Sequence, residues 1–161
     1  MSEQQRFNES PESGAIGTTY RISLKCAEDG TERMPTAGNL LLDTDVVVDF
    51  LRGLEPAVTF LHDNAERIHL SVVVVAAIYA GARKTEIEDI RSFVAAFPSI
   101  AISTAIAAAG GNLKRQYGSS HGLGLADALI AASAIEHGLR PATLNVKHFP
   151  MFPDLEPAYR K

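Results

Sequence analysis

Short apolar runs alternate with helix-like segments along the chain from Asn39 onward. Four of these runs are brief and rich in Leu, Ile, Val or Ala, which predicts buried strands. They are 39–43, 67–72, 99–103 and 141–145. Strands separated by helices predict a parallel sheet covered on both faces, an α/β sandwich. Ligands in such folds bind beyond the carboxyl ends of the strands.

The segments between the runs are typical of helices, because apolar residues recur every three or four positions or because Pro and Gly stand at their ends. They are 45–53, 57–66, 73–82, 85–97, 104–118 and 125–138. Gly110 and Gly111 are expected to weaken the fifth of these helices. Asp49 is expected on the solvated side of the first. The pattern therefore predicts helices on both sides of a four-stranded sheet.

Composition changes near Gly38. Residues 1–38 are rich in Ser, Glu, Gly and Thr, with one alternating piece, TYRISLKC (19–26), that fits a short strand. We expect a flexible or weakly attached extension, followed by a single domain over 39–161. Met34 lies just before the first strong apolar run, so translation beginning there is an alternative.

Charge and composition narrow the class of protein. The 161 residues are 46% hydrophobic, which is enough for a core, and the net charge of −4 provides no global basic field for nucleic acid. A local basic patch stays open. Cys26 is the only cysteine, so neither an intrachain disulfide nor a cysteine-based zinc site can form. With no apolar leader and no long uncharged apolar run, we expect a cytoplasmic protein without membrane association.

Polar side chains follow the predicted strands or begin the predicted helices. Asp43 comes directly after Leu40–Leu42, and Asp127 lies near the first turn of a helix of small residues. Thr143 and Asn145 end the last strand, with a Lys and a His just beyond. Each has an ordinary structural role as its alternative: Asp43 as a helix cap, Asp127 as a partner of the helix dipole, Asn145 as a turn residue. These polar ends are nevertheless expected to converge on one edge of the sheet.

Other catalytic patterns are missing from the sequence. The five histidines form no HExxH pattern, and GSSHGLG (118–124) has no Lys-Ser/Thr pair to make a P-loop. No GxGxxG follows a strand, and Ser119 and Ser120 lack the context of a nucleophile elbow. Zinc-protease, nucleotide-binding and serine-hydrolase chemistries are therefore disfavoured.

Four ordered motifs resemble the PIN-domain family, and most closely its VapC-type toxins. They are LLLDTDVVVDFLRG, SVVVVAAIYAGAR, HGLGLADALIAASAIEHG and ATLNVKHF, and the resemblance spans about 39–159. It implies a PIN-like α/β/α sandwich and an endoribonuclease that depends on Mg²⁺ or Mn²⁺ and cleaves RNA phosphodiesters. It further implies a homodimer and a cognate VapB-like antitoxin that blocks the acidic site.

The same resemblance assigns roles to the polar strand ends. Asp43 matches the first acid of the family and Asp127 the third, both as metal ligands and catalytic residues. Asn145 falls where a fourth acid or Asn occurs, and Thr143 is the small hydroxyl residue beside it. Carboxylate oxygens suit hard divalent cations, and such cations neutralise the charge that builds up on a reacting phosphate.

One departure from the family concerns the second acid. Counting from Ser71 places Ala77 where the family has Glu, and Val74 where it has Thr. Losing one carboxylate weakens divalent-ion binding, so reduced activity is expected. Three explanations stay open: an engineered inactivation, a natural degenerate member, or compensation by another acid. Asp45 is the nearest such acid in sequence, although a residue on the following turn need not reach the same ion.

Two other functions remain as alternatives. The first is a catalytically inactive PIN-like module that binds antitoxin or RNA without cutting it. The second is a haloacid-dehalogenase-like phosphatase, because LLLDTDVVV also contains an Asp-x-Asp pattern. The second is disfavoured because no suitable lysine and no downstream acidic pair follow.

Overall fold

A central parallel sheet organises the domain. The computed structural model describes residues 38–161, so the expected N-terminal extension, apart from Gly38, and its strand at 19–26 lie outside the described residues. The sheet has four strands in the order β3-β2-β1-β4, and all neighbours are parallel. They are β1 (Leu40–Leu42), β2 (Ile68–Ser71), β3 (Ser99–Ile100) and β4 (Arg140–Ala142). The predicted parallel α/β sandwich is confirmed.

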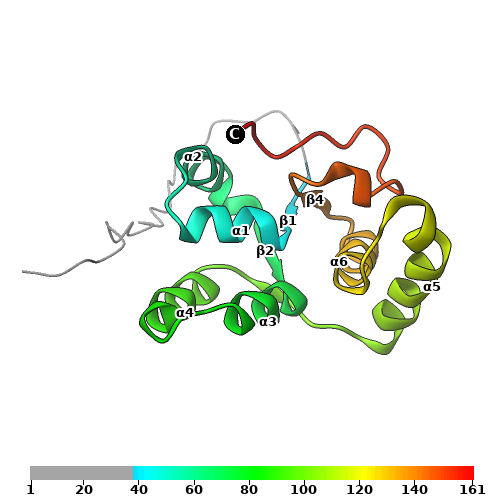
Figure 1. Ribbon diagram of the computed structural model, residues 1–161, viewed down its shortest axis with the longest axis horizontal. Helices are drawn as coiled ribbons and strands as arrows, with labels where there is room; N and C mark the ends of the chain where they lie inside the picture. Colours follow the sequence, from blue (N-terminus) through cyan, green and yellow to red (C-terminus); the bar gives the residue numbers. More distant parts are fainter. Residues whose placement is uncertain (1–37) are drawn as a thin grey trace, which may run out of the picture.

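Six α-helices flank the sheet in the part of the chain that the structure describes. They are α1 (Thr44–Leu51), α2 (Glu55–Asn64), α3 (Val72–Ala80), α4 (Ile87–Ala95), α5 (Thr104–His121) and α6 (Leu125–Glu136). Three short 3₁₀ segments complete the chain: η1 (Ala65–Arg67), η2 (Lys84–Glu86) and η3 (Val146–His148). In Figure 1 the first four helices lie to one side of the strands, and α5 and α6 lie together on the other.

Burial on both faces of the sheet explains why the strand sequences are continuous apolar runs. Leu41, Leu42 and Leu70 have no exposed surface, because helices cover both faces of the sheet. The central part of helix α6 is buried, and its alanines let it pack closely on α3 and β4. Strand β1 lies between β2 and β4, so its carboxyl end opens in the interior of the sheet rather than at an outer strand.

The two glycines do not interrupt α5, which runs without a break from Thr104 to His121. A Cβ atom at Gly110 would lie 2.8 Å from the Cδ2 atom of Leu129 and 3.3 Å from the carbonyl oxygen of Ala128. Gly110 therefore permits the close approach of α5 to α6, whereas a Cβ at Gly111 would meet nothing within 4 Å. The helical propensity lost at Gly110 is offset by packing that only the folded chain provides.

The last residues fold back across the molecule. After η3, the chain runs from the side of α5 and α6 to a position beside α2 (Figure 1). The amide of Ala158 donates to the carbonyl of Thr143 at 2.9 Å, and the ring of Tyr159 lies 6.0 Å from that of Phe60, centroid to centroid. Among the described residues, no helix has the length and hydropathy needed to span a bilayer.

Candidate functional site

The carboxyl ends of β1 and β4 bring Asp43 and Thr143 together. Leu42 pairs with Ala142 in the sheet, so the next residue of each strand lies at the same edge. The Thr143 hydroxyl donates to Oδ2 of Asp43 at 2.7 Å, and the Thr44 amide donates to Oδ1 at 2.7 Å. Asp43 is thus both the cap of α1 and a side chain at the strand edge, and the two expected roles coexist.

The surroundings of Asp43 disfavour the ionised form of its carboxyl group. Asp43 is only 5% exposed, and Thr143 is fully buried. Burial, the negative charge of Asp45 and, more weakly, that of Asp127 raise the pKa of Asp43 to about 6, although hydrogen bonds from Thr143 and Thr44 act in the opposite direction. Because neighbouring carboxylates disfavour its ionised form, a bound cation at this edge would be favoured.

Asp45 contributes a second carboxylate at the same place. Its Oδ2 accepts a hydrogen bond from the Leu144 amide at 3.0 Å and lies 3.5 Å from the Thr143 hydroxyl oxygen. Burial raises the pKa of Asp45, although the amides of Leu144 and Val46 oppose that rise. The sequence left open whether Asp45 reaches the site, and the structure places it beside the same threonine as Asp43.

Asp127 lies in the first turn of α6, as expected, and contacts a residue that the sequence did not pair with it. Its Oδ2 atom is 3.1 Å from Nδ1 of His148, in η3. Asn145 is exposed, and its backbone amide donates to the Thr143 hydroxyl at 2.9 Å. The strand edge therefore assembles Asp43, Asp45 and Thr143 by direct contact, with Asp127 close enough to influence Asp43 electrostatically.

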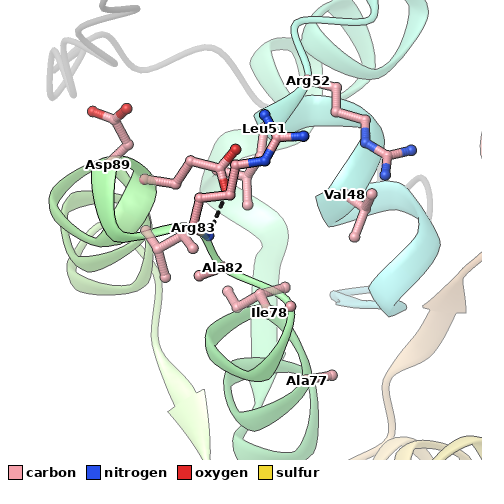
Figure 2. A pocket seen from close by; sticks show the side chains of 11 residues that line it. Val48, Leu51, Arg52, Ala77, Ile78, Ala82, Arg83 and Asp89 are labelled. Atoms are coloured by element: carbon pink, nitrogen blue, oxygen red, sulfur yellow. Dashed lines mark hydrogen bonds between the residues drawn. The ribbon is translucent and has the colours of Figure 1, made fainter. Parts of the chain in front are cut away.

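Ala77 lies on α3, half-buried, and brings no carboxylate to the site. It lines a pocket of about 330 Å³ between α1, α3 and α4. Figure 2 shows Ala77 at one end of this pocket, with Arg83 and Asp89 farther along it. Val74, the other departure from the family, belongs to the core and has no exposed surface.

The expectation that Asp49 is solvated was wrong, because it is only 7% exposed. Oδ2 of Asp49 accepts a hydrogen bond from the Tyr159 hydroxyl at 2.7 Å and lies 2.8 Å from Nζ of Lys161. Burial by itself raises the pKa of Asp49, but the hydrogen bonds and charge of these two partners outweigh it and hold the pKa below its ordinary value. The sequence gives no local signal of this contact, because its members are more than 100 residues apart.

The oxygen ligands at the strand edge are compatible with a divalent cation that keeps most of its waters. Within residues 38–161, no group of three or more His, Cys, Asp or Glu side chains is placed to hold a metal ion. Mg²⁺ needs fewer protein ligands, since it keeps several waters and is bound through one or two carboxylates together with substrate phosphates. Asp43 and Asp127 offer only oxygen ligands, and the raised pKa of Asp43 marks a place where positive charge is favoured. The residues therefore fit a hydrated Mg²⁺ or Mn²⁺.

Comparison with known proteins assigns the family. The sequence pattern of the PIN domain matches residues 40–149, which include every candidate site residue. The chain belongs to the PIN domain family. The predicted resemblance is confirmed for the larger part of the described chain.

Individual relatives of this PIN domain are VapC proteins. The chain is 44% identical over 124 residues to Ribonuclease VapC19 of Mycobacterium tuberculosis, covering 74% of this chain and 98% of the relative. It is 37% identical over 123 residues to Ribonuclease VapC10 of the same organism, covering 74% and 92%. Its fold also matches a toxin–antitoxin complex from Klebsiella pneumoniae, with a TM-score of 0.67 and 27% identity over 76% of this chain and 100% of the other.

Proposed function

We propose that this PIN domain is a VapC-type toxin, a divalent-metal-dependent endoribonuclease that cleaves RNA phosphodiesters. The observation that carries the proposal is the strand edge where Asp43, Asp45 and Thr143 meet, in a chain 44% identical to a protein named as a ribonuclease. A cognate VapB-like antitoxin is proposed as its partner, supported by the fold it shares with a toxin–antitoxin complex. A homodimer and a cytoplasmic location remain predictions.

In this proposal, Asp43 and Asp127 hold Mg²⁺ or Mn²⁺ beside Asn145. When bound there, the cation would supply activation of a water molecule and neutralisation of charge on the phosphate. The chain's own residues prepare the carboxylates for this role. Thr143 and the Thr44 amide each donate to one oxygen of Asp43, which fixes the direction of that carboxylate before any cation arrives. Fixed ligands lose little freedom on binding, which favours affinity.

Asp45 supplies negative charge to a site that lacks the family's acid at position 77. Its carboxylate lies beside the hydroxyl that also binds Asp43, so it adds negative charge at the strand edge. Among the three explanations for Ala77, partial compensation by Asp45 is the one that these contacts favour. We expect a protein that still binds the cation but cleaves RNA slowly.

Restoring the acid tests this function. The variant Ala77→Glu should cleave RNA at least about 10- to 100-fold faster than the unchanged chain with Mg²⁺ or Mn²⁺. That range is typical of groups that only support metal ligands, and a restored ligand should have no smaller effect. Ala76→Glu is the matched control, because it adds the same charge at an exposed neighbouring position of α3 and should change little. An Ala77→Glu protein that folds, binds no metal and cleaves no RNA would refute the proposal.

An inactive binding module is the second candidate. It is favoured by Ala77 and by the lack, within the described residues, of three acids placed around one point. Calorimetric titration of the unchanged chain with Mn²⁺ separates the two, since tight binding argues against an inactive site. The phosphatase alternative is not proposed, because the chain belongs to the PIN domain family.

A further inference from the structure

The contact between His148 and Asp127 joins two parts of the site that are far apart in sequence. Nδ1 of His148 lies 3.1 Å from Oδ2 of Asp127, and the two side chains are 22% and 27% exposed. His148 ends η3, and its amide donates to the carbonyl of Asn145 at 2.9 Å. The histidine is therefore held by the same turn that carries Asn145 away from β4.

The direction of this hydrogen bond follows from chemistry. An ionised carboxylate only accepts hydrogen bonds, so Nδ1 of His148 must carry the hydrogen and donate it to Oδ2. A carboxylate has two oxygens, and this bond uses only Oδ2 of Asp127. Within residues 38–161, no hydrogen bond reaches Oδ1 of Asp127, which leaves that oxygen for a further ligand.

The backbone between α5 and α6 packs closely around this pair. A Cβ atom at Gly124 would lie 3.5 Å from Oδ2 of Asp127, and one at Gly122 would lie 3.8 Å from Nε2 of His148. Nζ of Lys114 donates to the carbonyl of Leu123 at 2.7 Å, and Leu123 has no exposed surface. The pair is thus held against a connection that is itself fixed.

Asp127 has a competing arrangement if the histidine is removed. It is the third residue of α6, and the residue before the helix, Gly124, makes no side-chain cap. A carboxylate at the third helical position can turn back to the free amide at the start of its own helix. The histidine bond holds Oδ2 at one place and so selects one orientation of the carboxylate.

We propose that His148 is a positioning residue for Asp127: it binds one carboxylate oxygen and thereby presents the other to the divalent cation. This inference rests on the proposed function, since it assumes that Asp127 is a ligand. Groups that hydrogen-bond to metal ligands commonly affect metal affinity or activity by about 10- to 100-fold.

The test compares two substitutions that differ in where they place an amide. In His148→Asn the side-chain nitrogen can take the place of Nδ1, whereas in His148→Gln it reaches instead toward the position of Nε2. We expect His148→Ala and His148→Gln to weaken Mn²⁺ binding, measured calorimetrically, by about 10- to 100-fold, and His148→Asn to recover most of it. For RNA cleavage, kcat should fall while KM changes little, because Asp127 is not proposed to contact RNA.

The matched control is His137→Asn. His137 also hydrogen-bonds through Nδ1, to the carbonyl of Ser133, but it lies at the far end of α6. Urea unfolding of each variant verifies that the fold is retained. The inference is overturned if His148→Ala binds Mn²⁺ like the unchanged chain, or if the Asn and Gln variants behave alike.

Measurements on Asp127→Asn separate this inference from the proposed function. All variants are made both in the unchanged chain and with Ala77→Glu. If neither background binds Mn²⁺, the proposed metal site fails and this inference fails with it. If Asp127→Asn loses Mn²⁺ while His148→Ala keeps it, only the positioning role of His148 is overturned.

Discussion

Asp43→Asn should stabilise the folded protein at neutral pH while it removes the proposed metal ligand. The substitution deletes the buried negative charge but keeps the shape of the side chain. Its amide oxygen can still accept from the Thr44 amide, and its amide nitrogen can donate to the Thr143 hydroxyl. Asn is also as good a helix cap as Asp. The change therefore isolates the electrostatic cost of the carboxylate.

The size of the effect follows from the pKa of Asp43. Each pKa unit corresponds to about 1.4 kcal/mol, so the rise from 3.8 to about 6 sets an upper limit of about 3 kcal/mol. The side chain is only 5% exposed, so solvent screens little of this cost. Allowing about 1 kcal/mol for an altered hydrogen bond, we expect Asp43→Asn to raise the free energy of unfolding by about 1 to 2 kcal/mol at pH 8.

The effect should depend on pH in a defined direction. The pKa of Asp43 is higher in the folded state than in the unfolded state. Between about pH 4 and pH 6, Asp43 is therefore protonated in the folded state and already ionised in the unfolded state. The contribution of Asp43 to stability is therefore largest below pH 4 and is lost as the pH rises through about 6. The Asn variant lacks this titration, so the difference between the two proteins should grow over that range.

Urea unfolding in EDTA at a series of pH values between 4 and 8 measures the difference. The two proteins should have the same m value, since they expose the same surface on unfolding. Asp63→Asn is the control, because its side chain is 66% exposed. Adding Mn²⁺ should stabilise the unchanged chain more than Asp43→Asn. The reasoning is refuted if Asp43→Asn is the less stable protein at pH 8, or if the difference does not change with pH.

Two further predictions concern stability alone. Tyr159→Phe should lower the free energy of unfolding by about 1.5 to 3 kcal/mol, because it removes a hydrogen bond to a charged acceptor, Asp49. The control is Tyr79→Phe, which changes a partly exposed tyrosine and should have little effect on stability. The pKa of Asp49 is lowered in the folded state, so the loss of stability in Tyr159→Phe should be present above about pH 4 and should shrink as the pH falls through the folded-state pKa of Asp49. A loss below about 0.5 kcal/mol at pH 7 would contradict the role of Tyr159. Gly110→Ala should lower the free energy of unfolding, measured in urea, by about 1 to 3 kcal/mol because the added Cβ clashes with α6. Gly111→Ala meets no neighbour and should raise the free energy of unfolding by up to about 1 kcal/mol. Equal effects of the two substitutions would show that Gly110 is not needed for packing.

Local signals in the sequence were sufficient for the order of the elements. Apolar runs of three to five residues mark the strands, because a strand covered on both faces has few places for polar side chains. Helix ends were marked by residues with a local reason to stand there, such as Pro56 at the start of α2 and Gly53 just after α1, which adopts a left-handed backbone. These features depend only on the nearest few residues, so they can be recognised from the sequence without knowledge of the fold.

The candidate site was predictable only in part. Asp43 and Thr143 could be placed at one edge because the carboxyl ends of parallel strands meet there, and their side chains do meet. Asp45 could not, since whether its side chain reaches that edge depends on how α1 leaves the strand. The roles of Asp43, Asp127 and Asn145 in catalysis rest on resemblance to the family and remain predictions.

The sequence by itself determined the alternation of strands and helices, the caps and the residues available at the strand ends. Only the tertiary structure decided which of those residues meet. Strand order sets Asp43 against Thr143 across 100 residues, the return of the C-terminal segment buries Asp49 beneath Tyr159, and the turn after β4 brings His148 to Asp127. Such contacts have no signature in local pattern, because they depend on side-chain directions in a packed core rather than on the spacing of residues along the chain.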